Sequence, residues 1–195
     1  FNSALMGNTC VWKPATTSLL SNYYLMKILE EAGMPAGVIN FVPGSGATIS
    51  NIVMNHKDLA GIHFTGSNNT FNHLWEQATK NLSYYKSYPK LIGETGGKDF
   101  IFAHHSARPA ELATAIIRGA FEYQGQKCSA ASRAYIPASI WNEVKSILLS
   151  MTNRIKTGDV ADFDNFVNAV IDKNSYNNIM SYIEKVKQSD EAEII

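Results

Sequence analysis

The chain has 195 residues, of which 45% are hydrophobic, and its 17 basic and 17 acidic side chains balance to a formal charge of zero. This composition supports a folded core and excludes both a disordered chain and a global basic field for nucleic acid. No apolar run reaches the roughly 20 residues that cross a bilayer, and the first residues lack the basic start of a signal peptide. The two cysteines, Cys10 and Cys128, make neither a disulfide framework nor a zinc pattern, which is typical of a reducing compartment.

Strands and helices alternate in the first half of the chain. Apolar runs predict strands over residues 8–13, 38–42 and 60–65, and helical spacing of apolar residues predicts helices over 19–32, 47–55 and 69–82. Strands separated by helices of this length imply βαβ units, in which parallel strands form a sheet with helices on its faces. The predicted fold class is therefore α/β.

The pattern changes near Pro89. Strands are predicted over 90–92 and 100–103, on either side of a turn formed by Glu94–Lys98, and a helix over 109–123, a polar turn over 125–129, a strand over 133–137 and two further helices follow. We place a domain boundary after Glu94, between residues 1–94 and 95–195. Residues 192–195 look like the beginning of a strand, which favours a piece of a longer α/β protein over a short natural chain with frayed ends.

Two residues in turns are candidates for chemistry. Cys128 follows the polar turn Gly125–Lys127, where a thiol is approachable and the Lys127 ammonium would favour the thiolate; a buried structural cysteine is the alternative, and the local sequence leaves both open. Glu94 precedes Thr95–Gly97, whose glycines let backbone approach a ligand closely, so a partly buried Glu94 could act as a general base. A surface carboxylate in a hairpin is the alternative, and the local sequence alone favours it.

Two further segments are candidates for binding. The residues Thr65, Gly66, Ser67, Asn68, Asn69 and Thr70 lie between a predicted strand and a predicted helix. They place free N–H groups and hydroxyls at a helix N-terminus, which favours an anion such as a phosphate; a capped helix without a ligand is the alternative. Lys13 ends a strand and could reach a ribose or phosphate at the carboxyl edge of the sheet. The five histidines show no spacing for a shared metal, so no metal site is predicted.

Taken together and in order, the motifs of this chain resemble the aldehyde dehydrogenase superfamily. They are Trp12-Lys13-Pro14, Phe64–Ser67, Glu94–Lys98 and Gly125–Cys128. The interval between Glu94 and Cys128 also resembles the family's interval between its general base and its nucleophile. The resemblance implies part of a Rossmann-type NAD-binding domain over residues 1–94, followed by part of an α/β catalytic domain over 95–195.

The resemblance also implies roles for individual residues of an enzyme that uses NAD to oxidise a small-molecule aldehyde. Cys128 would be the nucleophile, and Glu94 would be the general base that activates water. Lys13 would hold the adenosine ribose, and Gly66–Thr70 would line the pyrophosphate. Ser129, next to the nucleophile, would contact the carboxylate of the substrate.

Further residues narrow the resemblance. Thr70 is followed by Phe71, where most of the family carries glycine, and residues 4–8 and 121–130 resemble those members that oxidise glutamate γ-semialdehyde to glutamate in proline catabolism. Another semialdehyde substrate and a thiol-bearing domain without catalysis are the alternatives. Thr16 lies where many relatives carry an acidic ribose ligand, which leaves the use of NADP open.

The resemblance implies more residues than the 195 of this chain. The family's oxyanion-stabilising asparagine would lie well upstream of Trp12, and a later glutamate that orients the nicotinamide ribose would fall beyond Ile195. The 195 residues alone are therefore expected to be inactive or nearly so. We further expect a homo-oligomer without a nucleic-acid or membrane partner, in the cytoplasm or, in a eukaryote, in the mitochondrial matrix.

Overall fold

The computed structural model describes residues 1–195 and divides them into two compact units, Phe1–Thr95 and Gly96–Ile195. Both units contain helices and parallel strands, which confirms the predicted α/β class. The roles assigned above to residues 1–94 and 95–195 stay predictions.

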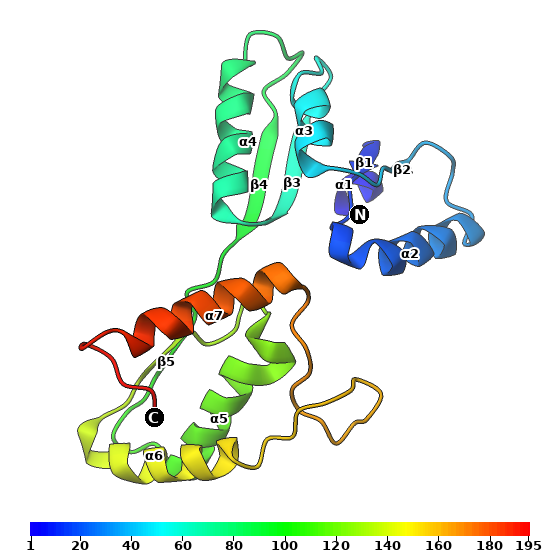
Figure 1. Ribbon diagram of the computed structural model, residues 1–195. Coiled ribbons are helices and arrows are strands. Elements are labelled where there is room, and N and C mark those ends of the chain that lie inside the picture. The colour runs from blue at the N-terminus through cyan, green and yellow to red at the C-terminus, as the bar shows by residue number, and fades with distance from the viewer. The chain divides into compact units, whose positions relative to one another are not determined.

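The first unit alternates helices and strands (Figure 1). In chain order its elements are α1 (Asn2–Leu5), β1 (Cys10–Trp12), the short 3-10 helix η1 (Thr16–Ser18), α2 (Leu19–Glu31), β2 (Ile39–Phe41), α3 (Gly46–Met54), β3 (Gly61–Gly66), α4 (Asn68–Lys80) and β4 (Lys90–Thr95). β1 pairs in parallel with β2, and β3 pairs in parallel with β4. The predicted parallel orientation is confirmed, but the strands form two separate two-stranded sheets instead of the one sheet expected, because β2 does not pair with β3.

The second unit contains β5 (Phe100–Phe102), α5 (Pro109–Phe121), the short segment η2 (Glu122–Gly125), β6 (Arg133–Tyr135), α6 (Ala138–Thr152) and α7 (Lys173–Lys187). Inside η2 the backbone of Tyr123 and Gln124 is not that of a 3-10 helix. β5 pairs in parallel with β6, so β4 and β5 do not form a hairpin. The predicted turn over Glu94–Lys98 is wrong for its first two residues, which belong to β4 because they pair with the end of β3. The strand expected over 192–195 is absent, since no other strand pairs with that segment.

The core of the first unit lies between α3, α4 and the β3–β4 pair. Its buried residues include Met54, Leu74 and Tyr85, and the Tyr85 hydroxyl donates a hydrogen bond of 2.6 Å to the Met54 carbonyl. Leu74 and Ala78 recur at helical spacing on the inner face of α4, as the apolar pattern predicts. This packing holds the N-terminus of α4 at the carboxyl end of β3.

The core of the second unit lies between α5 and α6. Leu112 of α5 and Val144 of α6 are buried there together with Ala103, which follows β5. No buried side-chain nitrogen or oxygen in the chain lacks a hydrogen-bond partner. Each unit therefore has a core of its own.

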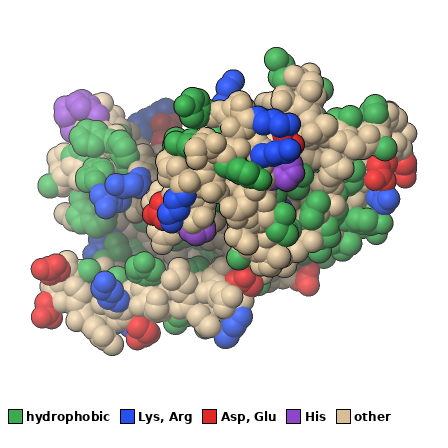
Figure 2. Space-filling view, turned by 90° about the horizontal axis from the view of Figure 1, so that it is seen from above, with side chains coloured by type: hydrophobic (Ala, Val, Ile, Leu, Met, Phe, Trp, Pro, Cys, Tyr) green, Lys and Arg blue, Asp and Glu red, His purple; other side chains and the backbone are tan.

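The surface mixes apolar and charged side chains. On the face seen in Figure 2, Lys and Arg side chains are interspersed with Asp and Glu side chains, and apolar groups lie between them. None of the helices is both long enough and apolar enough to span a membrane.

Candidate functional site

The carboxyl end of β3 leads directly into α4, where the sequence predicts an anion site. Ser67 caps this helix of 13 residues, because its Oγ accepts a hydrogen bond of 3.2 Å from the backbone N–H of Thr70 and lies 2.8 Å from Thr70 Oγ1. The N–H groups of Asn68 and Asn69 meet no acceptor, and residues 66–70 are all exposed. Free N–H groups at the positive end of a helix fit a phosphate-bearing group.

Two aromatic rings join the start of α4 to the ends of the strands. Phe71, in the first turn of α4, stacks on Phe64 of β3 with ring centroids 5.9 Å apart and planes 8° from parallel. A Cβ added to Gly93 would lie 2.3 Å from the Phe71 ring, and one added to Gly66 would lie 2.6 Å from the Phe64 ring. A Cβ at either position would therefore force the adjacent ring to move. No sequence signal links Phe71 to Gly93, because the contact joins segments far apart in the chain.

Glu94 lies on β4 opposite Thr65 of β3. Side chains alternate along a strand, so Glu94 is on the opposite face from Gly93, against which Phe71 packs. Its carboxylate is exposed and takes part in no hydrogen bond or ion pair. The exposure agrees with the surface carboxylate that the local sequence favours, and no element of this unit covers that face of the strand. The role of Glu94 as a general base stays a prediction. The carboxylate is free to meet a water molecule or a ligand.

Lys13 directly follows β1 and is half-buried. Its Nζ donates a hydrogen bond of 2.6 Å to the carbonyl of Pro14. No hydrogen bond joins it to residues 66–70. A ribose hydroxyl or a phosphate oxygen could replace this carbonyl as the acceptor, since both accept a hydrogen bond from an ammonium group.

Cys128 and Ser129 lie together in an exposed turn between η2 and β6, so the predicted accessibility of the thiol is confirmed. The chain reaches this turn through Tyr123, Gln124 and Gly125, whose φ angles are 54°, 58° and 66°. Such left-handed conformations are unfavourable for residues other than glycine.

A glycine brings the start of the second unit against this turn. A Cβ added to Gly97 would lie 2.1 Å from the carbonyl oxygen of Cys128. Only glycine allows so close an approach of the two backbones. Gly97, which follows the candidate base Glu94 by three positions, therefore lies against the backbone of the candidate nucleophile Cys128.

Lys127, which the sequence predicts to favour the Cys128 thiolate, forms an ion pair with Glu122. Its Nζ lies 2.6 Å from Glu122 Oε2, and a guanidinium nitrogen of Arg118 lies 2.6 Å from Glu122 Oε1. The hydrogen bond from Lys127, together with the positive charges of Lys127 and Arg118, lowers the pKa of the Glu122 carboxyl. Lys127 is thus paired with Glu122, and its expected effect on the Cys128 thiol stays a prediction.

Sequence reasoning missed the role of Glu122. Glu122 and Lys127 are five positions apart and lie beyond the end of α5. The helical pairing rules, which join residues three or four positions apart, therefore do not apply to them. The spacing of four positions between Arg118 and Glu122 is the signal that could have indicated one of the two pairs.

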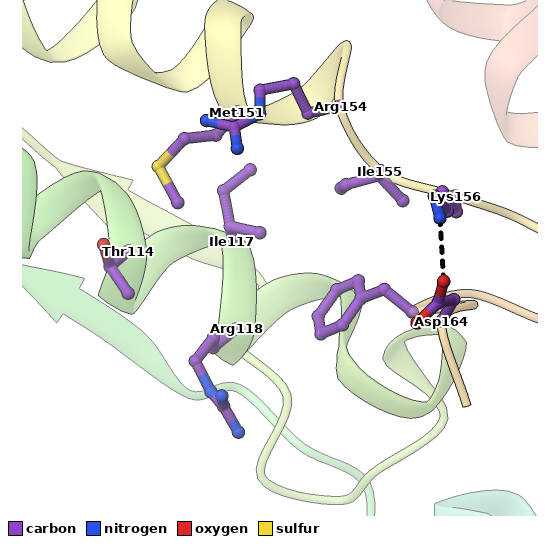
Figure 3. Close-up of a pocket in the computed structure, with 9 residues that line it drawn as sticks. Thr114, Ile117, Arg118, Met151, Arg154, Ile155, Lys156 and Asp164 are labelled. Atoms are coloured by element: carbon purple, nitrogen blue, oxygen red, sulfur yellow. Dashed lines mark hydrogen bonds and ion pairs between the residues drawn. The ribbon is translucent and has the colours of Figure 1, made fainter.

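A cavity of about 390 Å³ lies in the second unit between α5, the end of α6 and the loop that follows (Figure 3). An ion pair of 3.0 Å joins Lys156 to Asp164 at its edge. Neither Cys128 nor Ser129 lines it, whereas Arg118, which binds Glu122, does. Nowhere in the chain do three His, Cys, Asp or Glu side chains gather closely enough to hold a metal ion.

Comparison with known proteins gives consistent matches over nearly the whole chain. The sequence pattern of the Aldehyde dehydrogenase family matches residues 1–194. The mitochondrial Delta-1-pyrroline-5-carboxylate dehydrogenase of Dictyostelium discoideum is 53% identical over 194 residues, which are 98% of this chain and 35% of that protein. The corresponding protein of Danio rerio is 46% identical over 193 residues, with the same coverage of both chains.

A solved structure matches in three dimensions. It is the Delta-pyrroline-5-carboxylate dehydrogenase from Mycobacterium tuberculosis bound with NAD, which is 50% identical to this chain and superposes with a TM-score of 0.92. The match covers 95% of this chain and 35% of that one. The chain thus spans about a third of the length of the relatives it matches.

Proposed function

Because the chain belongs to the aldehyde dehydrogenase family, we propose that it carries the nucleophile of an enzyme that oxidises glutamate γ-semialdehyde to glutamate with NAD. The observation that carries the proposal is the exposed Cys128, presented on a left-handed turn inside the match to the family. The relatives named above as Delta-1-pyrroline-5-carboxylate dehydrogenases support this substrate, since that imine is the cyclic form of glutamate γ-semialdehyde.

In the proposed mechanism the Cys128 thiolate attacks the aldehyde carbon, and a thiohemiacetal forms through a new C–S bond. Bound NAD supplies the acceptor for the hydride that leaves this carbon. The product on Cys128 is a thioester. Glu94 then takes a proton from water, the resulting hydroxide attacks the thioester carbon, and cleavage of the C–S bond releases glutamate and restores the thiolate. Covalent catalysis thus divides one difficult oxidation into two easier steps.

The proposed cofactor contacts lie in the first unit. Lys13 would hold the adenosine ribose, and the pyrophosphate would accept hydrogen bonds from the free N–H groups of Asn68 and Asn69. Ser67 and Thr70 would add their hydroxyls, and Gly66 would allow close approach to the backbone. The unpaired and exposed state of these N–H groups supports the assignment.

The proposed substrate contact lies in the second unit. Ser129 is exposed beside Cys128 and would donate a hydrogen bond from its hydroxyl to the α-carboxylate of the substrate. A hydroxyl in that position would favour semialdehydes that carry a carboxylate over simple aldehydes.

The steady-state production of NADH from glutamate γ-semialdehyde by the full-length protein tests the proposal. We expect turnover in the wild type, a loss of about 10⁴-fold or more in Cys128→Ala, and wild-type rates in the control Cys10→Ala. Activity that survives in Cys128→Ala would remove this residue from the mechanism. Turnover of another aldehyde but not of glutamate γ-semialdehyde would keep the chemistry and reject the substrate.

We also propose that residues 1–195 alone are inactive and that the full-length protein is a homo-oligomer. The proposed compartment is the cytoplasm or, in a eukaryotic cell, the mitochondrial matrix; the relative from Dictyostelium discoideum is named as mitochondrial. NADH production by the purified 195 residues at the rate of the full-length protein would contradict the first proposal. Light scattering that gives a monomeric mass for the full-length protein would contradict the second.

A further inference from the structure

We propose that Glu122 is a positioning residue for Cys128. Its carboxylate holds the left-handed turn that leads from α5 to Cys128, and it keeps the Lys127 ammonium on itself instead of on the thiol. The inference rests on the proposed function, because it takes Cys128 as the reacting group.

The turn that Glu122 spans requires outside support. Tyr123 and Gln124 are the only non-glycine residues of the chain with a positive φ, and they are consecutive. Strained backbone of this kind persists only where surrounding contacts fix it. Gln126 supplies one such contact, because its Oε1 accepts a hydrogen bond of 2.8 Å from the backbone N–H of Ile171.

The Glu122 carboxylate supplies two more contacts, one on each side of the turn. Arg118 lies in the last turn of α5, before the left-handed residues, and projects from α5 away from Met151 (Figure 3). Lys127 lies after the left-handed residues and directly precedes Cys128. Because Arg118 and Lys127 each bind one oxygen of Glu122 at 2.6 Å, the carboxylate closes a ring of contacts around the turn. Both are charge-assisted hydrogen bonds between exposed side chains, so solvent screens them and we expect their effect on the geometry of the turn to exceed their effect on stability.

The same contacts set the charge beside the thiol. Lys127 precedes Cys128 in the chain, and its partner Glu122 also binds Arg118. Asp99 lies near Gly97, where its Oδ2 is 3.3 Å from the position of a Cβ on that glycine. With Glu122 present, the ammonium of Lys127 is paired. Removal of the Glu122 charge would leave an unpaired cation next to Cys128, and a nearby cation stabilises a thiolate over a thiol.

The test uses Glu122→Gln, which keeps the size of the side chain and removes its charge. In the full-length protein we expect kcat to fall about tenfold while KM for NAD stays within about twofold. The pH midpoint of Cys128 alkylation by iodoacetamide, followed by mass spectrometry with Cys10 as the internal reference, should fall by about 0.5 unit. Adding Lys127→Met should abolish this shift without restoring kcat.

A matched control removes another surface ion pair of the same unit. Glu184→Gln breaks the pair of 2.7 Å between Glu184 and Lys187 on α7 and should change neither kcat nor the alkylation midpoint. An unchanged midpoint together with wild-type kcat in Glu122→Gln would overturn the proposal. So would equal changes in Glu184→Gln.

Two further measurements guard against misfolding of Glu122→Gln and distinguish a failure of this inference from a failure of the proposed function. If Glu122→Gln does not fold, Lys127→Met alone leaves the pair between Arg118 and Glu122 intact. It should lower kcat about tenfold without lowering the midpoint, and wild-type kcat there would overturn the proposal. Alkylation is measured without substrate, so it separates this inference from the proposed function, which full activity of Cys128→Ala would overturn.

Discussion

The two units build their parts of the proposed site in different ways. In Phe1–Thr95 the start of α4 and the ends of β3 and β4 have regular backbone, and the space beside Gly93 is filled by a side chain, the ring of Phe71. In Gly96–Ile195 the turn before Cys128 has left-handed backbone, and the space beside Gly97 is filled by backbone, the carbonyl of Cys128. The first arrangement can be adjusted by a change of one side chain, whereas the second cannot.

The largest expected effect tests whether Glu94, at the end of β4 in the first unit, takes part in catalysis. Glu94→Gln keeps the shape of the side chain but removes the base, so kcat of the full-length protein should fall by about 10²- to 10⁴-fold. The first turnover should persist, because attack by Cys128 and hydride transfer precede the step that needs Glu94. Rapid-mixing measurements of NADH should therefore show an initial burst followed by a slow steady state. A burst that disappears along with the steady state would contradict the role of Glu94.

The next effect sharpens the contrast between backbone and side-chain contacts. Gly97→Ala would place a Cβ 2.1 Å from the Cys128 carbonyl, so the nucleophile must move. We expect kcat to fall about 100-fold, as for other small displacements of reacting groups. Gly46→Ala is the control, because a Cβ there meets nothing within 4 Å. If the two variants have equal kcat, the close approach at Gly97 does not position Cys128.

A smaller effect should be reversible in the first unit. Gly93→Ala would place a Cβ 2.3 Å from the Phe71 ring and should lower the free energy of unfolding by about 1–3 kcal/mol. In the double variant with Phe71→Ala this clash is absent, so the double variant should be more stable than the sum of the two single effects predicts. Urea unfolding of the full-length protein measures the coupling. Strict additivity would show that the ring and the glycine do not constrain each other.

The smallest effect separates a helix cap from a cofactor contact. Ser67→Ala and Ser45→Ala each remove an N-cap hydroxyl, from α4 and α3 respectively, and each should cost about 1 kcal/mol in thermal unfolding. Only Ser67→Ala should also raise KM for NAD, because only α4 begins at the proposed pyrophosphate site. If the two variants have the same KM for NAD, Ser67 caps α4 but does not contact the cofactor.

The regular elements of this fold could be predicted from the sequence, because their signals are local. The apolar spacing of Leu74 and Ala78 fixes the inner face of α4, and Ser67 marks its first turn. Strand partners could not be predicted in this way. The segment at Glu94 was expected to be a turn because glycines follow it, yet pairing with β3 extends the strand through Thr95.

In the candidate site, too, some features could be predicted from the local sequence and others could not. Cys128 was predicted to be accessible from its polar turn, and its position in the structure agrees. The partner of Lys127 was not predicted, because Glu122 and Lys127 meet only when the left-handed turn folds back. Contacts that depend on an unusual backbone conformation leave no periodic pattern in the sequence.

The left-handed pair at Tyr123 and Gln124 has a consequence for the amino acids that these two positions tolerate. Glycine has no Cβ, and asparagine adopts this backbone region more readily than most residues, so both should be accepted there. Valine, isoleucine and threonine should be rejected even though neither position is deeply buried, since their branched Cβ clashes with the local backbone. A saturation library read out for function would therefore show at these positions a preference set by backbone shape instead of by polarity or size.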